Sequence, residues 1–195
     1  MKWTDQIQNT LSSLKRREIT SGFSRESAVL IPIFERQGEL HFLLTRRTDE
    51  VETHKGQISF PGGMRDAGEP LKQTALRETY EEVGLKNVTI LGRFHDYVSI
   101  TDFRVTPYVG LLPDSFKIKA HPAEVAEVIQ VPFRIFRDPA NLRTERHHRV
   151  GKMLKVYFYS YGLHTIWGLT ARMIKEFLEE VDQYPSTRKS LYIST

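Results

Sequence analysis

The chain has 195 residues, 39% of them hydrophobic and 27% charged, with a net charge of +4 at pH 7. This composition is ordinary for a globular protein, and the length predicts one domain over residues 1–195. The absence of cysteine excludes disulfides, thiolate catalysis and cysteine-bound zinc. The N-terminus has no apolar run typical of a signal peptide, and no segment reaches the roughly 18 apolar residues of a membrane span. We therefore expect a cytoplasmic protein with no membrane partner.

The mild excess of positive charge indicates either an anionic small-molecule substrate or simply a basic, solvated surface. No stretch resembles an arginine-rich nucleic-acid-binding patch, so no nucleic-acid partner is expected. The sequence leaves the oligomeric state open, a homodimer included.

The first elements follow from apolar spacing. Trp3, Ile7, Leu11 and Leu14 recur at helical intervals and predict an amphipathic helix over residues 3–17. Two apolar runs, 28–34 and 40–45, flank the turn sequence ERQGE and predict a β-hairpin. A polar loop over 46–56 and a short strand over 57–60 follow, before a break at residues 61–63.

The second half alternates strands with helices. Apolar residues at helical spacing predict a helix over 71–83, and Gly84 is well placed to end it. Strands are predicted at 88–94, 105–112, 124–132 and 155–161, a second helix at 169–181, and a loose polar tail from residue 182. The pattern is typical of an α/β domain with helices packed on a mixed sheet.

Three glutamates crowd the first of these two helices. Glu78, Glu81 and Glu82 stand at i, i+3 and i+4, so they share one helix face. Like charges at this spacing are unfavourable unless neutralised, and Mg²⁺ or Mn²⁺ prefers carboxylate oxygens as ligands. Arg77 is placed to pair with Glu81. The alternative is a solvated acidic face with no ligand.

The Gly62-Gly63 pair comes just before this helix. Glycines let the backbone approach a ligand closely, and one of their carbonyls could serve as a metal ligand, although a plain turn is the alternative. Metals held by few carboxylates usually bind substrate phosphates as well. The sequence therefore predicts a metal-bound diphosphate that is attacked by an activated water.

The same residues carry a family resemblance. The Nudix signature is G-x5-E-x7-R-E-U-x-E-E-x-G-U, where U is bulky and apolar. The positions of the chain that match it, with the correct spacing throughout, are Gly63, Glu69, Arg77, Glu78, Glu81, Glu82, Gly84 and Leu85. Thr79 departs from the pattern at the first U, where its methyl group can still pack.

The resemblance continues upstream and downstream of the signature, over about residues 28–180. The sequence LLTRRTDEVETHKGQISFPGG (43–63) resembles the motif LLTxRxxxxxxHxGQxxFPGG of the coenzyme A diphosphatase branch of the Nudix family. The matching positions include Arg47, His54, Gly56, Gln57 and Phe60. IWGLTARM (166–173) is similar to the second-helix motif of that branch.

The resemblance implies an α/β/α sandwich and hydrolysis of a nucleoside diphosphate linked to another group. It implies that Glu78 and Glu82 are the main metal ligands and that Glu81 binds a further ion or supports them. The carbonyl of Gly62 or Gly63 is a further ligand candidate. Arg77 would orient the carboxylates, and Glu69 would support the loop or pair with Arg77.

The general base stays open between a glutamate of the signature and the downstream Glu124 or Glu127, which can equally be outward-facing strand residues. Arg47 is a candidate phosphate ligand or a surface salt bridge. His54 and Gln57 are candidates for substrate binding or loop ordering. The basic cluster RTERHHR (143–149) is either a solvated turn or a site for a 3′-phosphate.

Three functions compete. The upstream motif favours hydrolysis of coenzyme A or acyl-CoA to 3′,5′-ADP and 4′-phosphopantetheine or its acylated form. A Nudix hydrolase of ADP-ribose, NADH or a nucleotide sugar is the alternative. A non-catalytic Nudix module that binds a ligand is disfavoured because all three glutamates of the helix are present.

Overall fold

The computed structural model describes residues 2–48, 56–149 and 152–183. Its helices are α1 (Trp3–Ser13), α2 (Leu71–Val83), α3 (Phe133–Arg137) and α4 (Gly168–Gln183), with one 3₁₀ turn, η1 (Pro139–Asn141). The strands of its main sheet are β1 (Arg25–Arg36), β2 (Glu39–Arg47), β3 (Ile58–Ser59), β4 (Gly62–Met64), β5 (Thr89–Arg93), β6 (Tyr97–Val98), β7 (Phe103–Leu111) and β8 (Val125–Pro132). A smaller sheet holds β9 (Leu142–Arg149), β10 (Lys152–Tyr161) and β11 (His164–Trp167).

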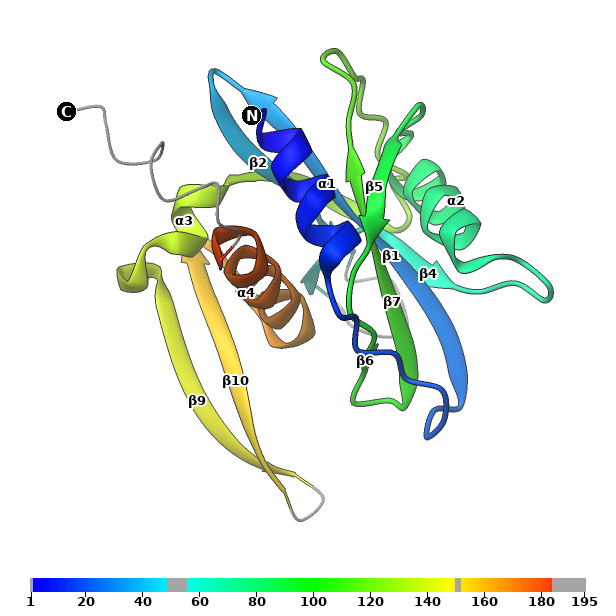
Figure 1. The fold of residues 1–195 in the computed structure, drawn as a ribbon, viewed down its shortest axis with the longest axis vertical. Helices are drawn as coiled ribbons and strands as arrows, with labels where there is room; N and C mark the ends of the chain where they lie inside the picture. The colour runs from blue at the N-terminus through cyan, green and yellow to red at the C-terminus, as the bar shows by residue number, and fades with distance from the viewer. Residues whose placement is uncertain (1, 49–55, 150–151, 184–195) are drawn as a thin grey trace.

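The main sheet is mixed. Its strands follow the order β3-β2-β1-β7-β5, with β8 paired to β2, β4 paired to β1 and β6 paired to β7. The β1–β7 pair is parallel, and the others are antiparallel. In the smaller sheet, β10 lies between β9 and β11. Figure 1 shows β9 and β10 extending away from the main sheet, on the side opposite α2.

Helices cover both faces of the main sheet (Figure 1). Successive side chains of a strand point to opposite faces, and the core residues of β1 divide in this way. Leu30 belongs to a cluster with Ala75 of α2, whereas Ile31 and Ile33 belong to the cluster that contains residues of α1 and α4. A strand buried on both faces is therefore apolar throughout its centre, as residues 28–34 are. This arrangement is the predicted α/β/α sandwich.

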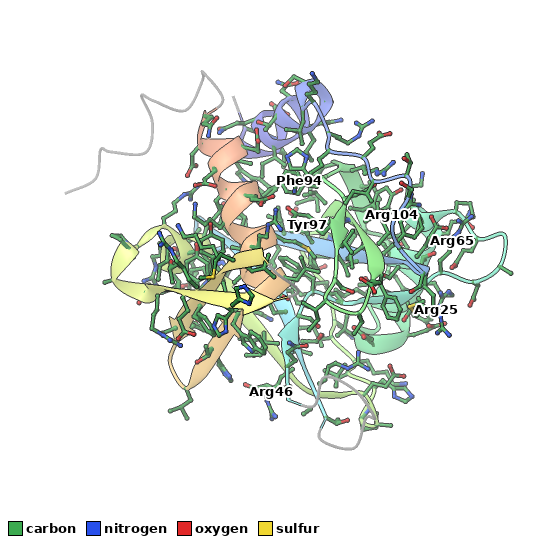
Figure 2. The ribbon with its side chains drawn as sticks, turned by 90° about the horizontal axis from the view of Figure 1, so that it is seen from below. Arg25, Arg46, Arg65, Phe94, Tyr97 and Arg104 are labelled. Atoms are coloured by element: carbon green, nitrogen blue, oxygen red, sulfur yellow. The ribbon has the colours of Figure 1, made fainter. Side chains whose placement is uncertain are left out.

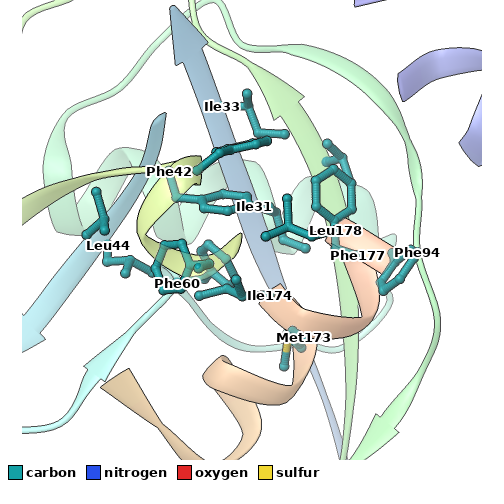
Figure 3. Close-up of a cluster of buried hydrophobic side chains, with 14 of the residues drawn as sticks. Ile31, Ile33, Phe42, Leu44, Phe60, Phe94, Met173, Ile174, Phe177 and Leu178 are labelled. Carbon is teal, nitrogen blue, oxygen red and sulfur yellow. The ribbon is translucent and has the colours of Figure 1, made fainter. Parts of the chain in front are cut away.

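An aromatic cluster fills the larger core, between the sheet and α4 (Figure 3). The ring of Phe42 stacks on Phe133, with 4.0 Å between centroids, and meets Phe60, Phe136 and Phe177 edge to face. These rings come from β2, α3, α4 and the segment before β4. The cluster therefore holds α3 and α4 against the sheet.

Most predicted elements are confirmed. The hairpin joins β1 to β2 through Gln37 and Gly38, which both have positive φ (53° and 78°), as a two-residue turn with the twist of the strands requires. The predicted helix over 71–83 matches α2, and Gly84 follows it with a φ of 71°. The strands predicted at 88–94, 105–112, 124–132 and 155–161 correspond to β5, β7, β8 and β10.

Two predictions were wrong. The first helix ends at Ser13 and not at residue 17, because the chain after it bonds to the sheet instead. The N–H of Arg17 donates to His95 Nδ1 at 3.0 Å, and the N–H of Ile19 donates to Asp96 Oδ2 at 3.1 Å.

Residues 143–149 are not a turn, since they lie in β9. The predicted tail is covered only to residue 183, which still belongs to α4.

Within the described ranges, none of the helices combines the length and the apolar character that a membrane crossing requires.

The aromatic cluster predicts a stability test. Phe42→Ala is expected to lower the free energy of unfolding by about 3–5 kcal/mol, because it leaves a cavity among four other rings. Ile100→Ala removes an exposed side chain and is expected to change it by less than about 0.5 kcal/mol. Urea unfolding of both variants measures this, and equal losses would contradict the role given to Phe42.

Candidate active site

One face of helix α2 packs against the main sheet. Thr74, Thr79 and Glu82 are buried there, against β1 and β4. Thr79, the one departure from the signature, is fully buried and donates its hydroxyl to the carbonyl of Ala75 at 2.6 Å. Its polar atom is therefore satisfied inside the helix, and the substitution leaves the packing of α2 intact.

The glycine pair lies in β4, between β1 and α2. A Cβ at Gly62 would lie 2.4 Å from the carbonyl oxygen of Ala28, and a Cβ at Gly63 would lie 2.4 Å from the carboxylate of Glu78. The backbone of β1 therefore excludes a side chain at Gly62, and a side chain at Gly63 would have to displace the carboxylate of Glu78. The carboxylate of Glu78 therefore packs directly against the backbone of Gly63. A close approach at the glycine pair was expected from the sequence.

An ion-pair cluster fixes the far end of β4. Glu26 of β1 accepts hydrogen bonds from Arg65, which directly follows β4, and from Arg104 of β7. Figure 2 shows Arg65 and Arg104 on the same side of the molecule, away from Arg46. The cluster ties the short β4 to the centre of the sheet.

Glu82 is the most deeply buried of the three glutamates, with 3% of its surface exposed. It receives a hydrogen bond from the backbone of Gly62, and Arg47 Nη1 lies 3.6 Å from its Oε1. Its Oε2 is buried without a hydrogen-bond partner. Burial raises the pKa of Glu82 to about 8, against a usual value of 4.5. A further cation at this oxygen would favour the ionised carboxylate.

Arg77 gathers the other carboxylates. Its Nε lies 2.9 Å from Glu69 Oε1, and its Nη1 lies 2.9 Å from both Glu78 and Glu81. Its Nη2 donates to the carbonyl of Met64 at 3.0 Å. The predicted pairings of Arg77 with Glu81 and Glu69 are both present. One guanidinium therefore joins α2, the loop before it and the end of β4.

Glu69 is the best-satisfied carboxylate of the cluster. It accepts two hydrogen bonds from Arg77, one from the hydroxyl of Thr74 at 2.7 Å and one from the N–H of Asp66 at 3.3 Å. The hydrogen bond from Arg77 is the main reason that its pKa falls from 4.5 to about 2. Sequence reasoning missed Thr74, whose spacing from Glu69 matches no standard motif.

The glutamates are therefore not a uniform solvated face. The exposed fractions of their side chains are 4% for Glu82, 17% for Glu78 and 50% for Glu81. In residues 2–48, 56–149 and 152–183, no three acidic or histidine side chains are grouped as they would be around an ion. The arginines hold the carboxylates instead. The orphaned oxygen of Glu82 and the glycine backbone against Glu78 nevertheless fit an oxygen-ligated cation.

The two downstream glutamates differ in position. Burial is the main cause of the raised pKa of both Glu78 and Glu82, and the negative charge of Glu124 adds to it. Glu127 instead lies 3.3 Å from Arg46 and 3.3 Å from His164. The charge of Glu124 therefore acts on the two carboxylates, although its own Oε1 lies 3.8 Å from His121 Nδ1, and Glu127 is engaged elsewhere.

The residues singled out outside the signature differ in where the structure places them. Arg47 faces Glu82, and its N–H donates to the carbonyl of Gln57 at 3.0 Å, so Gln57 lies beside it. His54 lies outside the described residues. The basic cluster 143–149 is in β9, on the other side of the molecule from α2 (Figure 1), so it does not join the site.

The segment between β7 and β8 also borders the site, where the sequence had indicated only Glu124 as a candidate. The N–H of Lys119 donates to the carbonyl of Val83 at 2.9 Å, and the N–H of His121 donates to that of Glu82 at 2.8 Å. The N–H of Thr48 donates to the carbonyl of Glu124 at 3.0 Å. The segment therefore bridges the C-terminal end of α2 and the end of β2.

Comparison with known proteins identifies the family of the chain. A family model of the NUDIX domain matches residues 24–152, more than half of the chain. The chain belongs to the Nudix family. Its relatives include the uncharacterized Nudix hydrolase NudL of Photorhabdus laumondii, which is 38% identical over 161 residues, 81% of this chain and 86% of the relative. NudL of Yersinia enterocolitica is 39% identical over 170 residues, 83% of this chain and 84% of the relative.

Solved structures agree on the fold. A MutT/nudix family protein from Enterococcus faecalis has a TM-score of 0.54 at 16% identity, and the match covers 93% of this chain and 75% of that one. The MutT protein from Methanosarcina mazei has a TM-score of 0.50 at 20% identity, with 87% and 96% covered. The family match and the NudL relatives, and not these structures, make the chain a Nudix hydrolase of nucleoside diphosphate derivatives, in a family that generally uses divalent metals.

The contacts of Glu69 predict a pH-dependent loss of stability. Its pKa is about 2 in the folded protein and 4.5 when unperturbed, so its stabilising effect is present above pH 4.5 and is lost as the pH falls towards 2. Glu69→Gln is therefore expected to destabilise the protein at pH 7 and progressively less below pH 4.5.

Urea unfolding between pH 7 and pH 3 measures this difference. Glu179→Gln removes an exposed partner of Lys175 and serves as the control, with little effect at any pH. A difference between wild type and Glu69→Gln that stays constant with pH would contradict the assignment.

Proposed function

We propose that this Nudix hydrolase cleaves the diphosphate bond of coenzyme A or acyl-CoA. The observation that carries the proposal is the upstream motif over residues 43–63, which resembles that of the coenzyme A diphosphatase branch. Its Arg47 lies 3.6 Å from Glu82, and the backbone of Gln57 accepts a hydrogen bond from that of Arg47, which supports a role for both residues near the glutamates. The whole chain, 1–195, would act as one Nudix domain.

The reaction is a hydrolysis at phosphorus. The oxygen of a water molecule bonds to one phosphorus of the diphosphate, and the bond from that phosphorus to the bridging oxygen breaks. The bridging oxygen leaves with the other phosphate. The products are 3′,5′-ADP and 4′-phosphopantetheine, or its acylated form.

Glu78 and Glu82 would hold Mg²⁺ or Mn²⁺ together with the carbonyl of Gly62 or Gly63, and Glu81 would bind a further ion or support the other two. When bound, such ions neutralise diphosphate charge and lower the pKa of water. The orphaned oxygen of Glu82 and its raised pKa support this assignment, because a nearby cation favours the ionised carboxylate.

Arginines would position the reacting groups. Arg77 holds Glu78 and Glu81 in fixed orientations and is itself fixed by Glu69. Arg47 would donate hydrogen bonds to a phosphate oxygen, since its Nε is buried without a partner in the described structure. Gln57 would bind the substrate or order its own loop, and we propose the same role for His54.

Glu124 is the better downstream candidate for the general base. Its charge acts on Glu78 and Glu82, and its carboxylate would take the proton that the attacking water loses. Glu127 is already paired with Arg46 and His164. A glutamate of the signature remains the alternative base.

The alternative function is hydrolysis of another nucleoside diphosphate derivative, such as ADP-ribose, NADH or a nucleotide sugar. A comparison of kcat/KM for these compounds, CoA and acyl-CoAs, with Mg²⁺ and with Mn²⁺, decides between them. CoA or an acyl-CoA is expected to be the best substrate. If CoA were no better than ADP-ribose, the alternative would replace the proposal.

Glu82→Gln is the control for this comparison. It is expected to abolish turnover of every substrate while the protein stays folded, because the amide is neutral and a poorer metal ligand. Circular dichroism and thermal unfolding check the fold. Unchanged turnover would contradict the metal assignment, and turnover of none of the substrates by the wild type would favour a non-catalytic module.

The two downstream glutamates make a matched pair. Glu124→Gln is expected to lower kcat by about 10²–10⁴-fold, the typical contribution of a general base, and to remove the acid limb of the pH–rate profile. Glu127→Gln breaks only the pairing with Arg46 and His164 and is expected to leave kcat within a few fold. Similar effects of the two substitutions would refute the choice of Glu124.

A further inference from the structure

A pocket lies beside the exposed side of α2, and of its lining residues only Glu81 has a role in the proposals above. It has a volume of about 460 Å³ and lies between the C-terminal end of the helix and the segment before β8. Its lining includes Tyr80, Glu81, Lys86, Lys119 and His121. Three of these five residues carry a nitrogen that can donate a hydrogen bond to an anion.

The pocket adjoins the carboxylate site. It shares Glu81 with the cluster held by Arg77. His121 Nδ1 lies 3.8 Å from Glu124 Oε1, and the backbone N–H of His121 donates to the carbonyl of Glu82. A substrate whose diphosphate lies at the glutamates can therefore extend a neighbouring group into the pocket.

The charges of the pocket favour an anion. Lys86 and Lys119 are positive, whereas the one acidic residue named in the lining, Glu81, is already engaged by Arg77 at 2.9 Å. The Nζ of Lys86 lies 4.8 Å from the centre of the Tyr80 ring, a cation–π contact that keeps the ammonium at the pocket wall.

The C-terminal end of a helix normally repels an anion, because its last carbonyls are unpaired. Here the carbonyls of Tyr80, Glu82 and Val83 accept hydrogen bonds from Gly84, His121 and Lys119 respectively. Because these carbonyls already accept hydrogen bonds from backbone N–H groups, they repel an anion in the pocket less than free carbonyls would.

We propose that Lys86, Lys119 and His121 bind a phosphomonoester on the nucleotide part of the substrate. The inference rests on the proposed function, since CoA carries a 3′-phosphomonoester on its ribose and ADP-ribose and NADH carry none. The pocket takes the role that the basic cluster 143–149 was a candidate for, and it does so on the side of the molecule where the glutamates lie.

The test compares two substrates that differ only in this phosphate. In the double variant Lys86→Gln/Lys119→Gln, the ratio of kcat/KM for CoA to that for 3′-dephospho-CoA is expected to fall about tenfold or more, as the loss of charge-assisted hydrogen bonds predicts. Lys72→Gln, at an exposed position of α2 outside the pocket, is the matched control and should leave the ratio unchanged. An unchanged ratio in the double variant would overturn the proposal.

A binding measurement separates this proposal from the proposed function. Isothermal titration calorimetry of the full chain with 3′,5′-ADP and with 5′-AMP requires no turnover. The wild type is expected to prefer 3′,5′-ADP, and the double variant is expected to lose that preference. If the preference is present but CoA is not hydrolysed, the pocket assignment holds and the proposed function fails. If CoA is hydrolysed but no preference exists, the pocket assignment fails alone.

Discussion

The guanidinium of Arg77 is the interaction on which the site depends. Without it, Glu69, Glu78 and Glu81 would be three like charges around the end of a two-glycine strand, and each would favour solvent. With it, one rigid planar group donates to all three carboxylates and to the carbonyl of Met64. The loop, the strand and the helix are thereby fixed relative to one another before any ligand binds.

Burial divides the glutamates into unequal partners. Glu82 is enclosed by β4 and Arg47 and keeps one oxygen without a hydrogen bond, whereas Glu81 is half exposed. An enclosed carboxylate is costly unless a cation is near, and this cost is the physical reason to infer a metal there. An exposed carboxylate carries no such argument, so the role of Glu81 rests on the family resemblance.

The sequence predicted the parts that depend on local spacing. Helix α2, its end at Gly84 and the pairing of Arg77 with Glu81 follow from short intervals in the chain, whereas the pairing of Arg77 with Glu69 was implied only by the family resemblance. The early end of α1 did not follow from such intervals, because it results from hydrogen bonds between Arg17 and His95, far apart in the chain. Nor did the choice between Glu124 and Glu127, because Glu124 ends a segment that α2 and Thr48 hold in place, Glu127 lies in β8, and no sequence pattern predicts these contacts.

The packing around β4 tolerates few substitutions, whereas the segment before β8 tolerates many. The backbone of β1 excludes a side chain at Gly62, and a side chain at Gly63 would displace the carboxylate of Glu78. The segment before β8 contacts α2 through its own backbone N–H groups, which every residue except proline supplies. Its side chains can therefore be exchanged while its position is kept. Selection for a new substrate would act on these side chains, and the residues around β4 would remain the same in enzymes of different specificity.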